Sequence, residues 1–354
     1  MAWVRTLRIR DLRNIRDETV ELDPGLNVFC GRNAQGKTSL LEAVGLVARG
    51  RSFRAEDSMS LIRRGAESLV AGADAGEEAA AALEVQLLPG RRAFRVDGRE
   101  VAPREYRGRL EVVVHATERL RVVRGSMRDR RQYLDRAAAA VWPTYRRELN
   151  EYERVLAQRN AALEARGRDE DVWTERLVAS GARLRRRRAD YAARLTAALA
   201  RGFRPSGEAY AVRLPGPASS EDEARAALAE ELAGLRPRER AAGRSLAGPH
   251  RDPVELLVDG RDVAEGASAG QARSLLLALA LASLRVYGEE TGRSAVALLD
   301  DLDSELDEER AGALCAEVAQ GGQALVTTAH RAWAESLRPL GRIYDVSAGA
   351  VRSA

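Results

Sequence analysis

Hydrophobic and polar residues alternate along much of the first hundred positions, as they do in strands with one buried and one exposed face. The alternating runs are residues 4–10, 19–22, 83–88 and 93–96. Turn-forming residues follow or separate them, at Asp23-Pro24-Gly25, Pro89-Gly90 and Asp97-Gly98. The run at 26–30 predicts a buried strand, residues 111–115 predict a further strand, and a helix is expected to start at 39–44. The first third of the chain therefore predicts a mixed α/β fold.

The pattern changes near residue 119, where apolar positions begin to recur at helical spacing among Ala, Leu, Arg and Glu. Helices are expected over 128–158, 172–201 and 221–235. These periodic stretches are too short for a long coiled coil. We interpret residues 125–242 as a helical arm inserted into an α/β head that comprises 1–124 and 243–354.

The α/β pattern returns after the arm. Residues 295–299 form an apolar run that ends in Asp300 and Asp301, and residues 323–328 form another that leads to His330. Runs of this kind are typical of buried parallel strands, which deliver polar residues to the carboxyl edge of a sheet where α/β folds bind their ligands.

Composition restricts the class of protein. The chain has 354 residues, of which 45% are hydrophobic and 31% charged, so it is expected to be globular and long enough for two domains. The two cysteines, Cys30 and Cys315, lie in apolar runs, so a disulfide framework is not expected. No signal peptide or membrane span is recognisable, and we expect a cytoplasmic protein. The net charge of +4 permits nucleic-acid binding without requiring it.

One segment carries a specific chemical signal. It fits the phosphate-binding pattern G-x-x-x-x-G-K-[ST] and lies between an expected strand and an expected helix, which is the context that the motif needs. The predicted nucleotide-binding residues in it are Gly31, Arg32, Asn33, Ala34, Gln35, Gly36, Lys37, Thr38 and Ser39. Backbone N–H groups of such a loop surround a phosphate, the lysine reaches the β- and γ-phosphates, and the threonine hydroxyl contacts Mg²⁺.

Lys37 is the only lysine in the chain, since all the other residues among the 57 Lys+Arg are arginine. An ammonium is compact, whereas a guanidinium is planar and forked, so the two do not substitute for each other in a phosphate cradle. The retention of one lysine at this position supports the prediction of a nucleotide site. A glycine turn that precedes a helix by chance is the alternative.

Asp300 is the candidate Mg²⁺ ligand, together with Thr38, and Asp301 is the candidate that orients or activates the attacking water. The alternative for these two acids is a helix N-cap. His330 is a candidate contact of the γ-phosphate or its water. Residues 185–188 form a basic run, for which a solvated helix face and a phosphate-contacting patch are equally good interpretations.

Residues 268–271 complete an ordered set with the phosphate loop, the acidic pair, residues 304–307 and His330. Together they resemble the Walker A loop, signature motif, Walker B strand, D-loop and switch histidine of ABC-type ATPases, and the inserted arm is similar to the SMC branch. More specifically, the chain resembles the RecF family of bacterial recombination mediators. The matching segments are 12–14, 25–28, 50–54, 130–136, 248–252 and 301–307.

This resemblance implies further site residues. Arg13 and Asn14 would join the nucleotide-binding set, as would the signature residues Ser268, Gly270 and Gln271. RecF-like chains have a Pro-Glu-Asp stretch where this chain has residues 116–119, and Glu118 is our candidate for the metal and water role there. His115, at a position that is aromatic in relatives, is expected to pack. In this fold class the signature serine completes a nucleotide site only across a dimer.

The function implied is an ATP-dependent DNA clamp of repair, recombination, replication and the SOS response. ATP and Mg²⁺ would bring two heads together on single-strand/double-strand DNA junctions. A weak, DNA-stimulated ATPase would time their release. The implied protein partners are RecR and RecO, with which the chain would help to load RecA, and no membrane is involved. Two alternatives remain open: an SMC-like structural DNA tether, and a transporter-type ABC ATPase subunit.

Overall fold

The structure, a computed structural model, describes residues 3–55, 57–76, 81–165, 170–202, 204, 207–216, 220–302, 306 and 308–354. The chain divides into two compact units. One contains Met1–Leu120 and Leu276–Ala354, and we call it the head unit. The other contains Arg121–Gly202 and Gly207–Leu275, and we call it the helical unit. Each is described by itself.

A six-stranded sheet in the head unit, sheet B, has the order β15-β14-β3-β13-β12-β8. The strands β14, β3, β13, β12 and β8 run parallel, and only β15 is antiparallel to its neighbour. Their bounds are β3 (Leu26–Cys30), β8 (Val112–His115), β12 (Val296–Leu299), β13 (Ala324–Thr328), β14 (Gly341–Ser347) and β15 (Ala350–Ser353). The strands β3, β12 and β13 are buried along their whole length, as the continuous apolar runs predict.

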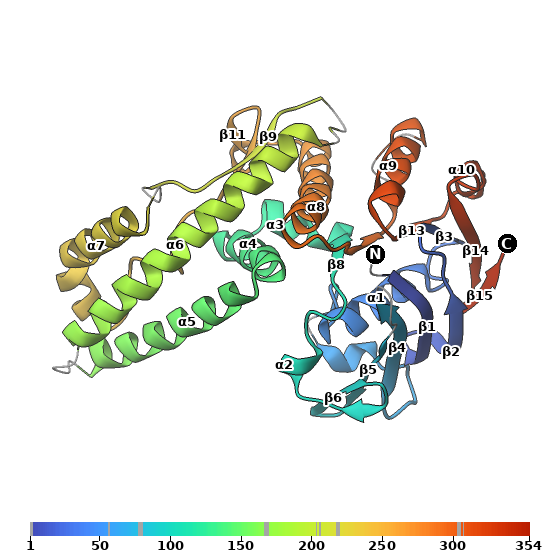
Figure 1. Cartoon of the computed structure of the whole chain (residues 1–354), viewed down its shortest axis with the longest axis horizontal. Helices are drawn as coiled ribbons and strands as arrows, with labels where there is room; N and C mark the ends of the chain where they lie inside the picture. Colours follow the sequence, from blue (N-terminus) through green and yellow to red (C-terminus); the bar gives the residue numbers. More distant parts are fainter. Residues whose placement is uncertain are drawn as a thin grey trace. The chain divides into compact units, whose positions relative to one another are not determined.

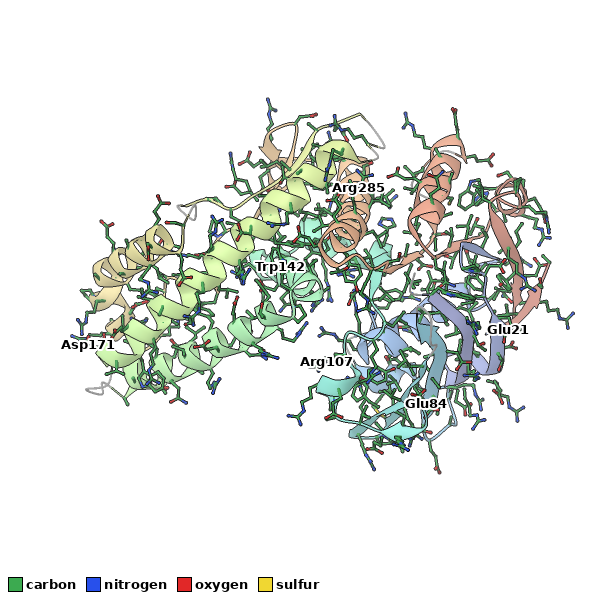
Figure 2. All side chains as sticks on the ribbon, in the orientation of Figure 1. Glu21, Glu84, Arg107, Trp142, Asp171 and Arg285 are labelled. Atoms are coloured by element: carbon green, nitrogen blue, oxygen red, sulfur yellow. The ribbon has the colours of Figure 1, made fainter. Side chains whose placement is uncertain are left out.

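A second six-stranded sheet in this unit, sheet A, is antiparallel throughout, with the order β2-β1-β4-β5-β6-β7. Its strands are β1 (Trp3–Leu12), β2 (Ile15–Glu21), β4 (Leu69–Gly76), β5 (Ala81–Leu88), β6 (Arg91–Val96) and β7 (Arg99–Glu100). One face is apolar, and the other carries ion pairs such as Arg8–Asp74 and Arg95–Glu84. Figure 2 shows Glu21 and Glu84 among the charged side chains of this sheet. This is the alternation that the sequence predicts.

Helix α1 (Lys37–Arg49) lies between the two sheets (Figure 1). Its side chains Leu40, Leu41 and Val44 belong to one core with Leu7 of sheet A and Leu325 of sheet B. The helix follows β3 directly, so its burial fixes the position of the loop that joins them.

The opposite face of sheet B packs against helices α9 (Glu308–Gly321) and α10 (Arg331–Ser336) and the later residues of α8 (Ala269–Thr291). Trp333 is 1% exposed there, and Cys315 is fully buried. Burial raises the pKa of the Cys315 thiol to about 12. Both cysteines are free and buried, in agreement with their expected role as small core residues.

Among the described residues, the long helices that lie wholly in the helical unit are α4 (Met127–Val141), α5 (Pro143–Glu164), α6 (Glu170–Arg201) and α7 (Glu221–Ala242). A three-stranded antiparallel sheet accompanies them, with the order β11-β10-β9 (Figure 1). Its strands are β9 (Tyr210–Arg213), β10 (Glu255–Val258) and β11 (Arg261–Asp262). Two four-residue α-helices are also described, α2 (Pro103–Tyr106) in the head unit and α3 (Arg121–Arg124) here. No helix among the described residues is long and apolar enough to cross a membrane.

Two expectations about this region differ from the structure. The helix expected over 128–158 is divided at Trp142, because Pro143 occupies the first position of α5 and lacks the N–H that would continue α4. Residues 243–275, which were expected in the head, cluster with the helices instead. The pairing of β10 with β9 joins this segment to the arm, because β9 follows α6 in the chain.

Candidate functional site

The candidate site lies at the carboxyl edge of sheet B. Because β3, β8, β12, β13 and β14 are parallel, the residues after them meet at one edge. The phosphate loop follows β3, the acidic pair follows β12, and His330 follows β13. The register also brings His115, at the end of β8, opposite Leu299. The strand ends predicted to carry the chemistry are therefore neighbours.

Two glycines set the shape of the loop. A Cβ on Gly31 would lie 2.2 Å from the carbonyl oxygen of Val346, so only glycine lets the loop start against β14. Gly36 has φ of +113° and caps the N-terminus of α1, a conformation that L side chains rarely adopt. A tight loop that leads directly into a helix N-terminus is the arrangement that binds phosphate groups in P-loop proteins.

Lys37 folds back over this loop. Its Nζ donates to the carbonyl oxygens of Gly31, at 2.6 Å, and Arg32, at 3.1 Å. The residue is only 8% exposed, so the ammonium is held at the loop rather than in solvent. A charge fixed at this point suits the phosphates of a nucleotide.

Thr38 and Asp300 meet directly, although 262 positions separate them in the chain. The Thr38 hydroxyl donates to Asp300 Oδ1 at 2.9 Å, and the Thr327 hydroxyl donates to the same oxygen at 2.6 Å. Asp300 is 6% exposed, and its backbone N–H donates to the carbonyl oxygen of His115 at 2.9 Å. A helix N-cap would not bring the carboxylate to Thr38, so this contact favours the metal-site interpretation of Asp300.

The donor set fits Mg²⁺. A hydroxyl oxygen and a buried carboxylate are hard oxygen ligands, and Mg²⁺ in nucleotide sites takes one or two such ligands and completes its shell with phosphates and waters. Among the described residues, no group of three His, Cys, Asp or Glu side chains could hold a metal by itself. A divalent ion here would therefore depend on Thr38, Asp300 and the bound nucleotide together.

Asp301 and His330 occupy exposed positions at the same edge. Asp301 has φ of +54°, a left-handed conformation that aspartate tolerates better than most residues, and its N–H donates to Thr327 Oγ1 at 2.9 Å. The N–H of His330 donates to Thr328 Oγ1 at 2.8 Å. Both backbones are thus held by hydroxyls of β13. Their chemical roles stay predictions.

Arg13 and Asn14, expected to bind nucleotide, support the loop from the turn between β1 and β2. Asn14 Nδ2 donates to the carbonyl oxygen of Gln35 at 3.0 Å, and Ser39 Oγ donates to Asn14 Oδ1 at 3.4 Å. Arg13 forms an ion pair with Glu42, a fully buried residue of α1. The described contacts therefore give these residues a supporting role, and direct contact with a nucleotide stays a prediction.

Gln35 is also held from a second turn, which sequence reasoning missed. Its carbonyl oxygen accepts from Gly349 N at 2.8 Å, and its Oε1 accepts from Ala348 N at 2.7 Å. Ala348 and Gly349 form the turn between β14 and β15. A glycine after a strand of the parallel sheet is the only sequence signal for it.

The signature residues lie in the helical unit, at the start of α8. Ser268 Oγ accepts from Gln271 N at 3.1 Å, and Gln271 Oε1 accepts from Ser268 N at 2.9 Å, so the two form a reciprocal capping box. Ser268 and Gly270 are exposed. This helix start is therefore ordered by its own side chains.

Two of the expected elements fall wholly or partly outside the described residues. The side chain of Glu118 lies outside the described residues, as do residues 304, 305 and 307 of the expected D-loop. Their roles stay predictions. His115 is fully buried, consistent with the packing role expected of it.

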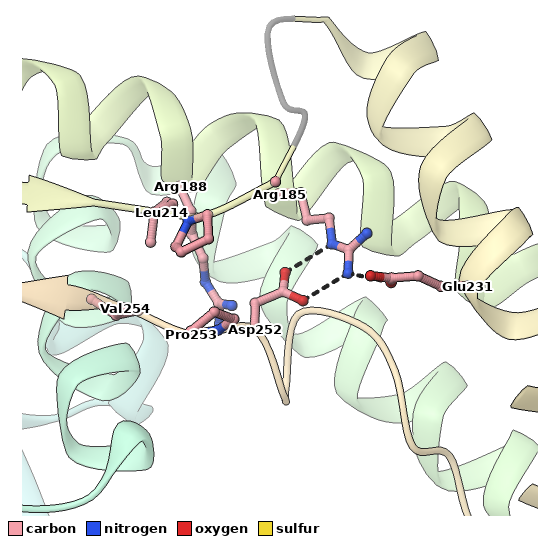
Figure 3. Close-up of a pocket in the computed structure, with 9 residues that line it drawn as sticks. Arg185, Arg188, Leu214, Glu231, Asp252, Pro253 and Val254 are labelled. Carbon is pink, nitrogen blue, oxygen red and sulfur yellow. Dashed lines mark hydrogen bonds and ion pairs between the residues drawn. The ribbon is translucent and has the colours of Figure 1, made fainter. Parts of the chain in front are cut away.

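The basic run 185–188 is a solvated helix face only in part. The side chains of Arg185 and Arg188 are 11% and 5% exposed, whereas those of Arg186 and Arg187 are 38% and 41% exposed. Each of the four is paired within the helical unit. Arg185 binds Asp252 and Glu231, Arg186 binds Asp190, Arg187 lies 3.6 Å from Glu148, and Arg188 binds Asp135. Figure 3 shows the fork of Arg185 between its two acids. The adjoining cavity is about 90 Å³, far below the size of a nucleotide pocket.

Comparisons with known proteins agree with this geometry. The family model of the RecF/RecN/SMC N-terminal domain matches residues 3–352. The chain is 37% identical over 343 residues to the DNA replication and repair protein RecF of Symbiobacterium thermophilum, covering 92% of this chain and 91% of that one. It is 38% identical over 349 residues to RecF of Streptomyces avermitilis, covering 92% and 93%.

Solved structures give the same result. The structure of the recombination mediator protein RecF with ATP superposes with a TM-score of 0.89 at 25% identity, covering 100% of this chain and 99% of that one. An Smc head domain from Pyrococcus furiosus has a TM-score of 0.59 at 14% identity, covering 100% and 96%, and shares the fold alone. The expected ABC/SMC-type ATPase head with an inserted helical arm is confirmed. The family model spans residues 3–352, and the two RecF relatives are 37% and 38% identical over 92% of the chain. The chain therefore belongs to the RecF family of DNA replication and repair proteins.

Proposed function

We propose that this protein is an ATP-gated DNA clamp of recombinational repair, which binds ATP with Mg²⁺ in the head unit and closes on DNA as a homodimer. The observation that carries the proposal is the hydrogen bond between Thr38 and Asp300. It joins the phosphate loop to the acidic strand end at the point where P-loop enzymes bind their metal. The relatives named as replication and repair proteins support the same role.

Within the site, this chain's residues would divide the work. Lys37 would neutralise charge on the β- and γ-phosphates, and Thr38 and Asp300 would hold Mg²⁺. When bound, the ion would stabilise charge that develops on the phosphate oxygens. Asp301 would orient the attacking water, and His330 would contact the γ-phosphate. Because aspartate is one methylene shorter than glutamate, turnover would be slow and suited to timing release.

Dimerisation would complete the site. Ser268 and Gly270 are exposed at a capped helix start, which offers a ready phosphate contact to a second copy. In this proposal Ser268 of one protomer contacts the γ-phosphate that Lys37 of its partner holds. Loss of that phosphate would remove the link between them and open the clamp.

The DNA would be a junction between single and double strands, where the protein would act with RecR and RecO to help load RecA in the cytoplasm. A solved relative is described as part of the RecFOR pathway, which supports this partnership. A structural tether is less well supported, because the longest helix of the described chain, α6, has 32 residues and a length of about 48 Å. A transporter subunit would leave the inserted helical unit unexplained.

Light scattering coupled to gel filtration tests the dimer. With ATP and Mg²⁺ the wild type should run as a dimer, and Ser268→Arg should bind ATP normally yet remain a monomer. Ser126→Arg is the matched control, because Ser126 is an exposed capping-box serine of the same unit, at the start of α4. It should dimerise like the wild type.

Two results would contradict the proposal. One is a wild type that stays monomeric in saturating ATP and Mg²⁺. The other is a Ser268→Arg variant that loses ATP binding and dimerisation to the same extent, because the serine would then serve its own protomer's site.

A further inference from the structure

Thr327, near the end of β13, contacts both members of the acidic pair. Its hydroxyl donates to Asp300 Oδ1 at 2.6 Å and accepts from Asp301 N at 2.9 Å. The residue is 1% exposed, so these bonds are shielded from water. The same strand end touches the phosphate loop, because Gly31 N donates to the carbonyl oxygen of Thr328 at 3.2 Å.

We propose that Thr327 is a positioning residue for ATP turnover, which fixes the metal-binding carboxylate of Asp300 and the backbone of Asp301 through one hydroxyl. The proposal rests on the nucleotide chemistry proposed above. It adds a residue that neither the loop motif nor the acidic pair contains.

The chemistry of a hydroxyl explains why one group can hold both the Asp300 carboxylate and the Asp301 backbone. A threonine hydroxyl has one proton to donate and lone pairs to accept, so both contacts can be made at once. Donation to an ionised carboxylate is a charge-assisted bond and is stronger than a neutral one. Thr38 donates to the same carboxylate oxygen, so two hydroxyls together fix the orientation of Asp300.

The bond to Asp301 has a separate consequence. Asp301 holds a left-handed backbone, which persists where surrounding contacts impose it. The Thr327 hydroxyl is one of these contacts, and it also holds Asp300. A shift of the metal-binding carboxylate would therefore be transmitted to the residue proposed to orient water.

Simple packing does not account for a threonine here. The preceding positions Leu325 and Val326 on this buried strand are apolar, and valine has nearly the shape of threonine. Valine would fill the same space without the hydroxyl. The functional difference between threonine and valine at this position is therefore the pair of hydrogen bonds.

The experiment compares Thr327→Val with Thr327→Ser, which keeps the hydroxyl. The affinity for a fluorescent ATP analogue is measured first in EDTA and then at rising Mg²⁺ concentrations. The readout is the Mg²⁺ concentration at which half of the gain in affinity over the EDTA value is reached. Thr327→Val should raise this concentration about 10- to 100-fold, as loss of a group that orients a metal ligand does. The affinity of Thr327→Val for the analogue in EDTA should stay within about twofold of the wild-type value. Thr327→Ser should restore most of the wild-type dependence of affinity on Mg²⁺.

A matched control separates this effect from the general loss of a hydroxyl. Thr196 Oγ1 also donates and accepts, to and from the backbone of Val212 in the helical unit, at 3.1 and 3.0 Å. Thr196→Val should leave the Mg²⁺ response unchanged. If Thr327→Val does not fold, Thr327→Cys, with a weak donor of similar size, replaces it under the same criteria.

The proposal is overturned if Thr327→Val keeps the wild-type Mg²⁺ response, or if Thr327→Ser fails as badly as valine. A wild type that binds the analogue equally in EDTA and in Mg²⁺ also overturns it, since Asp300 would then orient no metal. A protein that passes this test but never binds DNA would instead contradict the proposed clamp, so the two failures are distinguishable.

Discussion

The head unit and the helical unit use charged residues in opposite ways. In the head unit, charged and polar groups gather at the carboxyl edge of sheet B, where Lys37 donates to the phosphate loop and Asp300 accepts from Thr38. In the helical unit, buried arginines bind acids of the same unit, as in Arg130–Asp262, Arg159–Glu239 and Arg188–Asp135. An arginine-rich segment is therefore no proof of a phosphate-binding surface. To predict the role of such a segment, one must know which acidic residues pack against its arginines.

The surface of the helical unit gives a second example of arginines that contact side chains of their own unit. Trp142, labelled in Figure 2, lies at the junction of α4 and α5, and two guanidinium groups stack on it. Arg194 lies 5.2 Å and Arg187 5.7 Å from its ring centroid. These contacts stabilise the packing of α6 on the junction through cation–π attraction.

The largest effect should come from breaking a buried ion pair of the helical unit. Arg159 and Glu239 are 1% and 0% exposed, and Arg159→Met would leave the carboxylate buried without its partner. Such a change costs about 3–5 kcal/mol, or roughly 10 °C in melting temperature. Nucleotide affinity measured below the transition should not change.

Calorimetry of the single and double variants checks this. Glu239→Gln added to Arg159→Met removes the orphaned charge, while its amide oxygen can still accept from Leu246 N as Glu239 Oε1 does. We expect the double variant to recover at least half of the loss. A single variant that melts like the wild type would show that the pair does not stabilise the unit.

At Lys37 we expect a substitution to change nucleotide affinity and leave thermal stability almost unchanged. Lys37→Met should weaken ATP binding by about a hundredfold or more, because a charge-assisted bond to phosphate is lost from a shielded site. Its melting temperature without nucleotide should change little, since the Lys37 ammonium donates to two carbonyl oxygens of the loop itself, those of Gly31 and Arg32. Isothermal titration and thermal melting measure the two effects, and a variant that binds ATP normally would remove the nucleotide site from the loop.

A smaller effect is expected at Gly349, which connects the β14–β15 turn to the loop. An added Cβ would lie 2.5 Å from the carbonyl oxygen of Asn14, so Gly349→Ala should displace Asn14 and Gln35. We expect ATP affinity to fall about tenfold, equivalent to ~1.4 kcal/mol.

Gly98→Ala is the matched control for this change. Gly98 also has a positive φ, in a turn after Asp97, but nothing lies within 4 Å of the added carbon. Both variants place an alanine at a positive φ, +76° at Gly98 and +85° at Gly349, and only Gly349→Ala presses on the loop. Equal ATP affinities in the two variants would contradict the role of the turn.

The smallest effect concerns His250, which bonds to the Tyr152 hydroxyl at 2.6 Å. Burial lowers its pKa to about 4 from an ordinary value near 6.5. Between these values the unfolded chain binds more protons than the folded one, so this residue's contribution to stability falls as the pH drops from about 6.5 to 4. The other charged groups that act on it are Arg131, Arg251 and Asp252.

Melting temperatures at pH 7 and pH 5 test whether His250 lowers the stability of the fold as the pH falls. His250→Gln should show a shallower decline than the wild type, because glutamine does not titrate. A variant that declines as steeply as the wild type would assign the acid sensitivity to other groups.

Much of the head unit could be predicted from sequence because its signals are local. The loop motif, the acidic pair and the apolar strands are contiguous, and parallel pairing then brings their ends together. β4 was missed because Ala71 to Ala75 contains small residues with weak periodicity. Thr327 was missed because its importance depends on the register between β12 and β13, which one sequence does not contain.

The helical unit was harder to predict for the same physical reason. The helix pattern of 185–188 is visible, but Arg185 pairs with Asp252 at a separation of 67 positions. No local pattern connects those residues. The alternatives for the basic run considered only solvent and phosphate, whereas the structure supplies acids from the same unit.

The most direct test of the account is the binding of a labelled gapped duplex, compared in ATP, ADP and no nucleotide by fluorescence anisotropy at several salt concentrations. We predict tight binding with ATP and Mg²⁺, much weaker binding in the other two states, and a steep fall with salt because phosphate contacts release counterions. Lys37→Met should abolish the difference between states. Equal affinity of the wild type in all three states would contradict ATP gating of the clamp.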